Sequence, residues 1–267
     1  MDLQLTGKRA IVTGGSRGIG KACARALALE GCDVVIVARG EEALRATAAE
    51  LHTETGRAIT PVVCDTTNDE SVKASMRDAV AALGGGVDIL VNCAATAGGQ
   101  APAPTLAEIS DDNYWADMNV KVLGYLRTAR ELAPTMAAQG WGRIINISGL
   151  GARNAGSLLT SMRNVSVAAL TKNLADELGP KGINVTVVHP GTTRTEATPG
   201  VIAHRAQSTG RTEAEVEQQM NEGNVVRKLI DAKDIGVVVA FLASPLSIAI
   251  TGDAIAAGGG APRSIYY

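Results

Sequence analysis

Residues 9–30 read RAIVTGGSRGIGKACARALALE, and this stretch decides the fold class. Its first part, 9–14, is short, apolar and rich in β-branched residues, which predicts a buried strand. The part that follows the glycines is rich in alanine and leucine, and a helix is expected over 18–30. A strand that passes through a glycine-rich turn into a helix is typical of the βαβ units of α/β proteins.

The rest of the chain repeats this alternation. Further strands are expected at 33–38, 59–65, 87–93, 142–148, 183–189 and near 253–257. Helices are expected at 41–54, at 69–83, in two segments up to about 138, at 157–178 and at about 231–243, with one short helix at 212–221 inside a long polar segment. Strands that are apolar on both faces and separated by helices indicate a parallel sheet covered on both sides. We therefore predict an α/β fold, a doubly wound parallel sheet of Rossmann type in a single domain over 1–267.

Composition excludes several classes of protein. The 267 residues carry a formal net charge of -2 without a basic run, and only 3% of them are aromatic, so neither nucleic acid nor a membrane surface is an expected partner. The start of the chain lacks the apolar stretch of a signal peptide, and a cytoplasmic protein is expected. No CxxC pair occurs among the four cysteines, so we expect neither a metal site nor a disulfide framework.

The glycines of the opening stretch carry the first functional motif. Gly14, Gly18 and Gly20 form GxxxGxG, a spacing variant of the dinucleotide fingerprint. Glycines permit a tight turn and let backbone N–H groups approach a pyrophosphate at the start of a helix. A glycine-rich turn without a ligand is the alternative, but the flanking strand and helix favour binding.

The end of the second expected strand bears on the choice of cofactor. An NAD-binding domain usually has an acid here for the ribose 2′-OH, whereas this chain has Ala38 followed by Arg39. Arg17 lies in the glycine loop, and two guanidinium groups without a carboxylate suit a 2′-phosphate. NADP(H) is therefore favoured over NAD(H), with two merely solvated surface arginines as the alternative.

At this point the chain resembles the short-chain dehydrogenase/reductase family over nearly its whole length. The segments TGGSRGIG at 13–20, NCAA at 92–95 and PGTTRT at 190–195 are similar to family motifs, and Asp65 matches the acid that contacts the adenine. The resemblance implies cofactor contacts from Gly14, Ser16, Arg17, Gly18, Ile19, Gly20, Arg39, Asp65, Thr66, Asn92, Ala94, Pro190, Gly191, Thr193 and Thr195.

The resemblance also implies hydride exchange between a nicotinamide and a carbonyl or alcohol carbon. The family uses Ser, Tyr and Lys for proton traffic, and Asn119 matches its active-site asparagine. A phenol with a pKa near 10 becomes a usable acid only beside a cation, and an i, i+4 spacing puts the Tyr and the Lys on one helix face. Counting back from LTKNLADEL places these two positions at Thr160 and Asn164, and no Tyr occurs between Tyr125 and Tyr266. We therefore expect an altered proton relay.

The position of the family serine has two solutions in this sequence. Ser148 lies 12 residues before Thr160, a separation like that of the family, whereas counting from Arg143 gives Gly149. A loop shortened by two residues between 149 and 159 would reconcile the two counts. Thr160 and Asn164 could hydrogen-bond a substrate oxygen or the ribose, or could serve only as a helix cap and first-turn residues. Arg163 is one residue from the Lys position and is expected to point about 100° away from it.

Three other candidates could compensate for the missing pair. His189 ends the sixth expected strand at the carboxyl edge of the sheet and could protonate a substrate oxygen, although a packed strand-end histidine is the simpler interpretation. Cys93 should lie near the nicotinamide side, more as a small core residue than as a nucleophile. Tyr266 and Tyr267 could reach a neighbouring subunit, with interface packing as the simpler interpretation.

Three functions follow from these observations. The first is an NADP(H)-dependent oxidoreductase that acts on a small carbonyl or alcohol substrate with an altered proton relay. The second is a catalytically silent nucleotide-binding subunit or sensor, and the third is a non-redox enzyme, an isomerase or dehydratase, in the same cleft. The resemblance further implies a homo-oligomer, a tetramer or a dimer, and a substrate lid over about 192–226.

Overall fold

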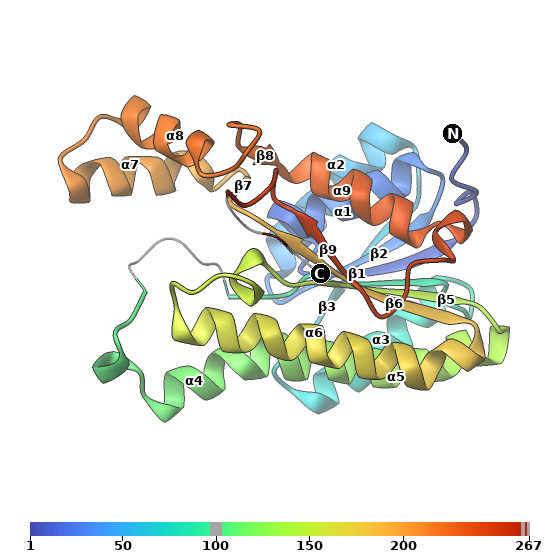
Figure 1. The fold of residues 1–267 in the computed structure, drawn as a ribbon. Coiled ribbons are helices and arrows are strands. Elements are labelled where there is room, and N and C mark those ends of the chain that lie inside the picture. Colours follow the sequence, from blue (N-terminus) through green and yellow to red (C-terminus); the bar gives the residue numbers. More distant parts are fainter. Residues whose placement is uncertain (97–102, 263–264, 266–267) are drawn as a thin grey trace.

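Seven strands form one sheet in the order β3-β2-β1-β4-β5-β6-β9 in the computed structural model, which describes residues 1–96, 103–262 and 265 (Figure 1). Every pairing in this sheet is parallel. The strands are β1 (Arg9–Thr13), β2 (Asp33–Ala38), β3 (Ile59–Val63), β4 (Ile89–Asn92), β5 (Gly142–Ile147), β6 (Ile183–Pro190) and β9 (Ala254–Ala257). The chain order reverses between β1 and β4, and such a switch point opens a crevice at the carboxyl ends of the strands.

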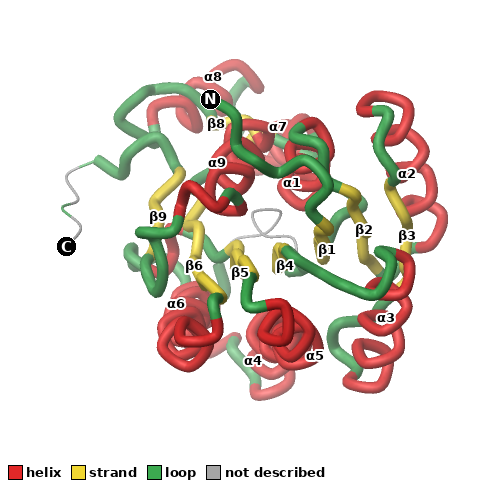
Figure 2. The backbone as a smooth tube through the Cα atoms, turned by 90° about the vertical axis from the view of Figure 1, so that its right-hand side faces the viewer, coloured by secondary structure: helices red, strands yellow, loops and turns green. Residues whose placement is uncertain are grey.

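Helices cover both faces of the sheet (Figure 2). One face carries α1 (Gly18–Leu29), α2 (Glu41–Thr55) and α9 (Ala232–Ala243), and the other carries α3 (Asp69–Ala82), α5 (Gly124–Gln139) and α6 (Leu158–Leu178). The helix α4 (Asp111–Met118) precedes a π-helical turn over Asn119–Leu123, which continues into α5. Within the described ranges, no helix is long and apolar enough to cross a membrane.

The side chains of β2 explain why the sheet is covered on both sides. Val34 and Ile36 belong to the apolar cluster under α1 and α9, whereas Val35 and Val37 belong to the cluster on the opposite face. Successive side chains of a strand point to opposite faces, so an uninterrupted apolar strand must be buried twice. The prediction of a doubly wound, Rossmann-type single domain is confirmed.

The segment after β6 contains more structure than the sequence analysis expected. The expected helix at 212–221 corresponds to α8 (Glu213–Glu222), but a second helix, α7 (Thr198–Thr209), precedes it. The short strands β7 (Thr193–Arg194) and β8 (Ile230–Asp231) form a separate parallel pair. The prediction of one helix here was wrong because α7 has only a short apolar stripe, Ile202 and Ala206, which packs on Val216 of α8. The two helices project together beyond the carboxyl ends of the strands (Figure 1).

Candidate functional site: a cleft at the carboxyl ends of the strands

A cleft of about 1370 Å³ lies at the carboxyl ends of the central strands. It is bounded by the glycine loop after β1, by the ends of β2, β4, β5 and β6, and by α7 and α8. Most residues that the sequence analysis selected line it: Gly14, Ser16, Arg17, Gly18, Ile19, Gly20, Arg39, Thr66, Ala94, Ser148, Thr160, Asn164, Pro190, Gly191, Thr193 and Thr195. Four selected residues do not appear in its lining: Asp65, Asn92, Asn119 and His189.

The glycine loop fits a phosphate group. Gly14 and Gly18 have φ values of +68° and +57°, which side chains rarely adopt. A Cβ on Gly20 would lie 2.2 Å from the carbonyl oxygen of Gly14, so the helix approaches the loop too closely for any larger residue. The N–H of Gly18, at the start of α1, donates to Oε1 of Glu196 at 2.7 Å. A carboxylate therefore lies where the positive end of the helix dipole favours an anion.

Two arginines lie near the end of β2. Ala38 ends the strand, and the exposed side chains of Arg39 and Arg17 both line the cleft. Asp65, by contrast, turns back on its own loop, since Oδ1 accepts from the N–H of Thr67 at 3.0 Å and from its hydroxyl at 2.8 Å. These hydrogen bonds, the N–H of Thr67 first, lower the pKa of Asp65. In this conformation Thr66 lines the cleft and Asp65 does not.

Asn92 is fully buried, and its amide group lies in a network beneath the cleft. Its Nδ2 donates to Oδ1 of Asn146 at 3.0 Å, and its Oδ1 accepts from the hydroxyl of Thr128 at 2.7 Å. Asn146 in turn donates to the hydroxyl of Thr171 at 2.9 Å. The network joins β4 and β5 to α5 and α6, so Asn92 ties the layers together where the sequence analysis expected a cofactor contact.

Asn119 also points away from the cleft. Its Oδ1 accepts from Nη1 of Arg127 at 2.7 Å, and its Nδ2 donates to the backbone oxygen of Thr67 at 3.3 Å. The side chain therefore fixes the π-helical turn to the loop after β3. In this arrangement Asn119 has no side-chain contact with the residues expected to bind substrate.

His189 is 1% exposed on β6, which extends one residue further than expected, to Pro190. Burial, and to a smaller extent the charges of Arg153 and Lys121, lowers the pKa of its imidazole to about 4. The ring is therefore neutral at pH 7, and Nδ1 has no hydrogen-bond partner among the described residues. A neutral imidazole outside the cleft lining is not placed to protonate a substrate, and the packed strand-end histidine describes this residue.

The first turns of α6 line the cleft through Thr160 and Asn164. Ser157 is the N-cap and accepts from the N–H of Thr160, so the cap is not Thr160 itself. The hydroxyl of Ser148 donates to the backbone oxygen of Asn164 at 3.1 Å. A Cβ on Gly149 would lie 3.0 Å from Nδ2 of Asn164, so position 149 faces this side chain directly. The geometry favours the count that assigns the family serine position to Gly149.

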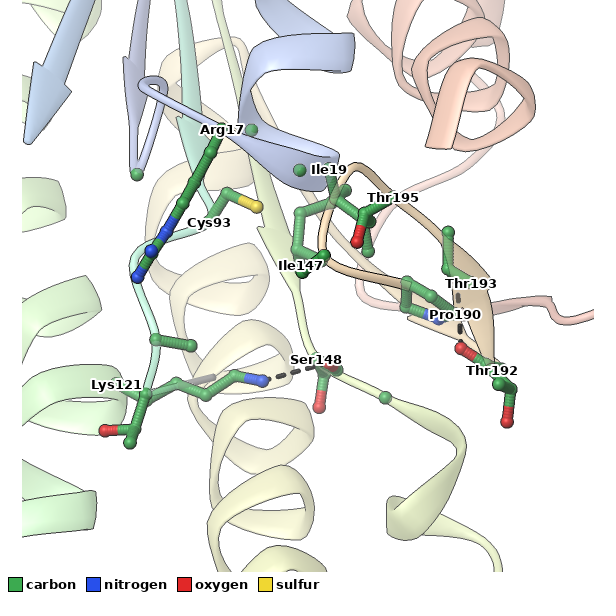
Figure 3. Close-up of a pocket in the computed structure, with 18 of the residues that line it drawn as sticks. Arg17, Ile19, Cys93, Lys121, Ile147, Ser148, Pro190, Thr192, Thr193 and Thr195 are labelled. Carbon is green, nitrogen blue, oxygen red and sulfur yellow. Dashed lines mark hydrogen bonds between the residues drawn. The ribbon is translucent and has the colours of Figure 1, made fainter. Parts of the chain in front are cut away.

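Lys121 is a buried basic residue of the cleft that was not among the candidates from the sequence. It is 3% exposed and lines the cleft, and its Nζ donates to the backbone oxygen of Ser148 at 2.9 Å and to Oδ1 of Asn164 at 3.1 Å (Figure 3). Burial, and to a smaller extent the charge of Arg163, lowers the pKa of its ammonium to about 7. Lys121 and Asn119 lie two residues apart on the π-helical turn and point to different sides, Lys121 to the cleft and Asn119 to Arg127.

Arg163 and Cys93 complete this part of the cleft. Arg163 lines the cleft, and its Nη1 lies 2.5 Å from Oδ1 of Asp117 on α4. Burial raises the pKa of the Cys93 thiol to about 12. The thiol is therefore neutral at pH 7, which agrees with the interpretation of Cys93 as a small packing residue.

Comparison with known proteins identifies the family of this chain. Residues 14–261 match the family model described as enoyl-(acyl carrier protein) reductase. The short-chain reductase protein NovJ of Streptomyces niveus is 35% identical over 254 residues, 95% of this chain and 93% of that protein. The chain belongs to the short-chain dehydrogenase/reductase family. The names of the matching family model and of this relative both describe reductases. The doubly wound sheet of this chain agrees with membership of an oxidoreductase family.

Solved structures of the family superpose closely on this chain. L-sorbose reductase of Gluconobacter frateurii, complexed with NADPH and L-sorbose, has a TM-score of 0.92 at 28% identity and covers 99% of this chain and 100% of its own. A xylitol dehydrogenase bound to NAD⁺ has a TM-score of 0.86 at 26% identity and covers 96% of this chain and 100% of its own. The short-chain dehydrogenase/reductase neighbours thus include proteins with either nicotinamide cofactor.

Gly149, Thr160 and Asn164, the positions at which the sequence register predicts the family Ser, Tyr and Lys, all line the cleft. None of them titrates near pH 7. Tyr266 and Tyr267 lie outside the described residues. Lys121 is the buried cation that contacts the family Lys position in this short-chain dehydrogenase/reductase fold.

Proposed function

We propose that this protein is an NADP(H)-dependent oxidoreductase that interconverts a small carbonyl compound and its alcohol with a proton relay unlike that of its family. The observation that carries the proposal is the continuity of the cleft. The same cleft is lined by Gly14 and Arg39 of the expected cofactor site and by Thr160, Asn164 and Met220 of the expected substrate site. A cofactor and a substrate can therefore meet inside one enclosure.

The residues around the glycine loop fit a dinucleotide. Positive φ values at Gly14 and Gly18 support close approach of a pyrophosphate, and the Glu196 carboxylate on the N–H of Gly18 supports an anion at this point. Arg17 and Arg39 would hold a 2′-phosphate, because guanidinium groups bind phosphate bidentately. The bound nicotinamide would supply or accept hydride at the substrate carbon. The chain itself contributes the positioning of the substrate, which accelerates a reaction by several orders of magnitude.

The segment 192–226 would act as the substrate lid. Its helices α7 and α8 contribute Val201, Arg205 and Met220 to the cleft, on the side opposite Lys121 and Asn164. A segment that covers a cleft excludes water from the reacting groups. This part of the proposal predicts that the substrate contacts lie on α7 and α8.

The proposal includes that this protein forms a homo-oligomer and that it acts in the cytoplasm. Val165 on α6 and Val237 and Phe241 on α9 are exposed, and such apolar faces on two helices support association of identical chains. Light scattering coupled to size-exclusion chromatography would separate a dimer or a tetramer from a monomer.

The test of the proposed function uses the purified chain, NADPH, NADH and a panel of ketones and aldehydes. NADPH should raise the thermal midpoint more than NADH at equal concentration. Slow, substrate-dependent oxidation of NADPH should be detectable with at least one carbonyl compound, with the corresponding alcohol as the product by mass spectrometry. Equal thermal shifts would contradict the NADP preference, and absence of any turnover would contradict the redox activity.

A catalytically silent nucleotide-binding subunit remains the second candidate. One observation favours it: no phenol is found between Tyr125 and Tyr266, and Tyr125 itself is buried with its hydroxyl donating to the backbone oxygen of Ile147 at 2.8 Å. Binding of NADPH without turnover on the whole panel would support this second function.

A further inference from the structure

Lys121 reaches the catalytic half of the cleft from an unusual direction. The family brings its lysine from α6, whereas Lys121 comes from the π-helical turn Asn119–Leu123 that joins α4 to α5. Its ammonium ends between β5 and α6, where it bridges the oxygen of Ser148 and the side chain of Asn164. Figure 3 shows the side chain extended across the floor of the cleft toward Ser148. The ammonium of Lys121 therefore contacts the side chain of Asn164, the residue that stands at the expected position of the family lysine.

The hydrogen bonds of Lys121 leave one donor unused. An ammonium has three N–H groups, and the described residues accept from Nζ at two places, Ser148 and Asn164. Both acceptors are uncharged, so no carboxylate is bonded to Nζ in the described part of the chain. The third N–H is available to an oxygen that enters the cleft, which Lys121 lines.

The charges around Lys121 come from four elements. Arg163 on α6 and Asp117 on α4 form an ion pair with each other, so their effects on Lys121 partly cancel. Cys93 after β4 and His189 on β6 are neutral at pH 7, with a raised thiol pKa and a lowered imidazole pKa. Burial therefore dominates, and it brings the pKa of Lys121 to about 7. A group that titrates near the working pH is well suited to acid–base catalysis.

We propose that Lys121 is the proton donor to the substrate oxygen in carbonyl reduction and the proton acceptor in the reverse direction. This inference rests on the proposed function. A bound reduced nicotinamide would supply hydride to the carbonyl carbon, and the C=O π electrons would move to oxygen. An O–H bond forms as one N–H bond of Lys121 breaks, and the neutral amine regains a proton from water. Ser148 and Asn164 position the amine through the two hydrogen bonds that remain.

The experiment compares the wild type with Lys121→Gln. Glutamine keeps an N–H donor for Ser148 and Asn164 but cannot release a proton in this pH range, so it separates positioning from proton transfer. Lys172→Gln, on the exposed face of α6, is the matched control for loss of a lysine charge. Two quantities are measured: the pH profile of kcat/KM for NADPH-dependent reduction of the best carbonyl in the panel, and the titration of ¹³Cε-labelled lysines by NMR without cofactor.

The expected result has three parts. The wild-type kcat/KM falls as the pH rises above about 7, because the reduction needs the protonated amine. The NMR signal missing from Lys121→Gln titrates with the same midpoint in the wild type. Lys121→Gln lowers kcat/KM by about 10²- to 10⁴-fold and removes the basic limb, while its NADPH affinity and that of Lys172→Gln stay within about threefold of the wild type.

Three results would overturn the inference. Turnover in Lys121→Gln with a wild-type pH profile would assign the proton to another donor and leave the proposed function intact. A Lys121 signal that titrates above pH 9 would show an ordinary amine that is not poised for proton transfer. Absence of turnover in the wild type itself would overturn the proposed function, and the proton donor with it. Lys121→Arg serves as a second variant if Lys121→Gln does not fold, because arginine keeps the charge and the donors but does not release a proton.

Discussion

The backbone N–H of Gly18 donates a 2.7 Å hydrogen bond to Oε1 of Glu196, which ties the start of α1 to the segment after β7. The carboxylate therefore occupies the anion position that a cofactor pyrophosphate needs. Binding of the dinucleotide must displace Glu196 from this position. Glu196 lies just before α7, so we expect cofactor binding to change the position of the proposed lid.

Replacing Glu196 with glutamine should strengthen cofactor binding. A carboxylate at a helix start contributes about 0.3–1 kcal/mol, so Glu196→Gln should lower the Kd for NADPH about two- to fivefold. The measurement is a fluorescence titration with NADPH at low salt. Glu177→Gln, an exposed carboxylate on α6, is the control with the same change in charge. Identical Kd values for the two variants would show that Glu196 does not compete with the cofactor.

Replacing Arg39 should reduce discrimination between the two nicotinamide cofactors. A charge-assisted hydrogen bond contributes about 1.5–3 kcal/mol, so Arg39→Leu should weaken NADPH binding about tenfold to a hundredfold. NADH lacks the 2′-phosphate, and its Kd should change by less than about threefold. Calorimetric titration of both cofactors measures the effect, with Arg45→Leu on α2 as the control, since Arg45 pairs with Glu41 outside the cleft. An equal loss for both cofactors would contradict a contact with the phosphate.

Asn92 should contribute to stability and not to cofactor affinity. Asn92→Ala leaves the buried Oδ1 of Asn146 without its donor, whereas the hydroxyl of Thr128 keeps the backbone oxygens of Gly124 and Tyr125 as acceptors. The loss should cost about 1–3 kcal/mol of unfolding free energy. Urea unfolding measures the loss, and Asn173→Ala, on the exposed face of α6, is the control. The Kd for NADPH should stay within about threefold of the wild type. A large selective loss of NADPH affinity in a stable variant would restore Asn92 as a cofactor contact.

The fold could be predicted from the sequence because the patterns that specify it are short and recur along the chain. Each apolar run such as DVVIVA specifies a doubly buried strand by itself, and the glycine loop specifies the crevice between β1 and β4. The helix α7 could not be predicted in the same way. Its few apolar residues gain a partner only when α8 folds back on them, and this contact is not visible in either segment alone.

The sequence places the glycine loop at the cleft for a similar reason, since its geometry is specified locally by the glycines between strand and helix. The rest of the site depends on the direction of single side chains. Asn92 and His189 end strands at the expected edge, yet both side chains are buried outside the cleft lining. Lys121 faces the cleft because the π-helical turn fixes Asn119 toward Arg127. The sequence of a helical segment does not specify whether Lys121 or Asn119 points into the cleft.

His189 should make the protein less stable as the pH falls below 6.5. The imidazole pKa is about 4 in the folded chain and about 6.5 in the unfolded chain, so only the unfolded chain binds a proton between these values. Stability is complete above pH 6.5 and decreases toward pH 4, by about 2 kcal/mol between pH 7 and pH 5. The measurement is urea unfolding at both pH values, in the wild type and in His189→Leu. The variant should lose about 2 kcal/mol less over this interval. Parallel losses in the two proteins would show that the imidazole is not held neutral.

Lys121 and Asn164 should be strongly coupled, because Nζ lies 3.1 Å from Oδ1. Asn164→Lys, the change that restores the family lysine, replaces this acceptor by a second buried ammonium and should cost about 3–5 kcal/mol of unfolding free energy. Lys121→Met in the same chain removes the repulsion, so the double variant should be more stable than Asn164→Lys alone. Urea unfolding of the two single variants and the double variant closes a double-mutant cycle, with an expected coupling of about 1–3 kcal/mol. Ala169→Lys on the exposed face of α6 should cost far less. Additive single effects would contradict the contact. A coupled pair would show that a lysine at position 164 is tolerated only after Lys121 is replaced.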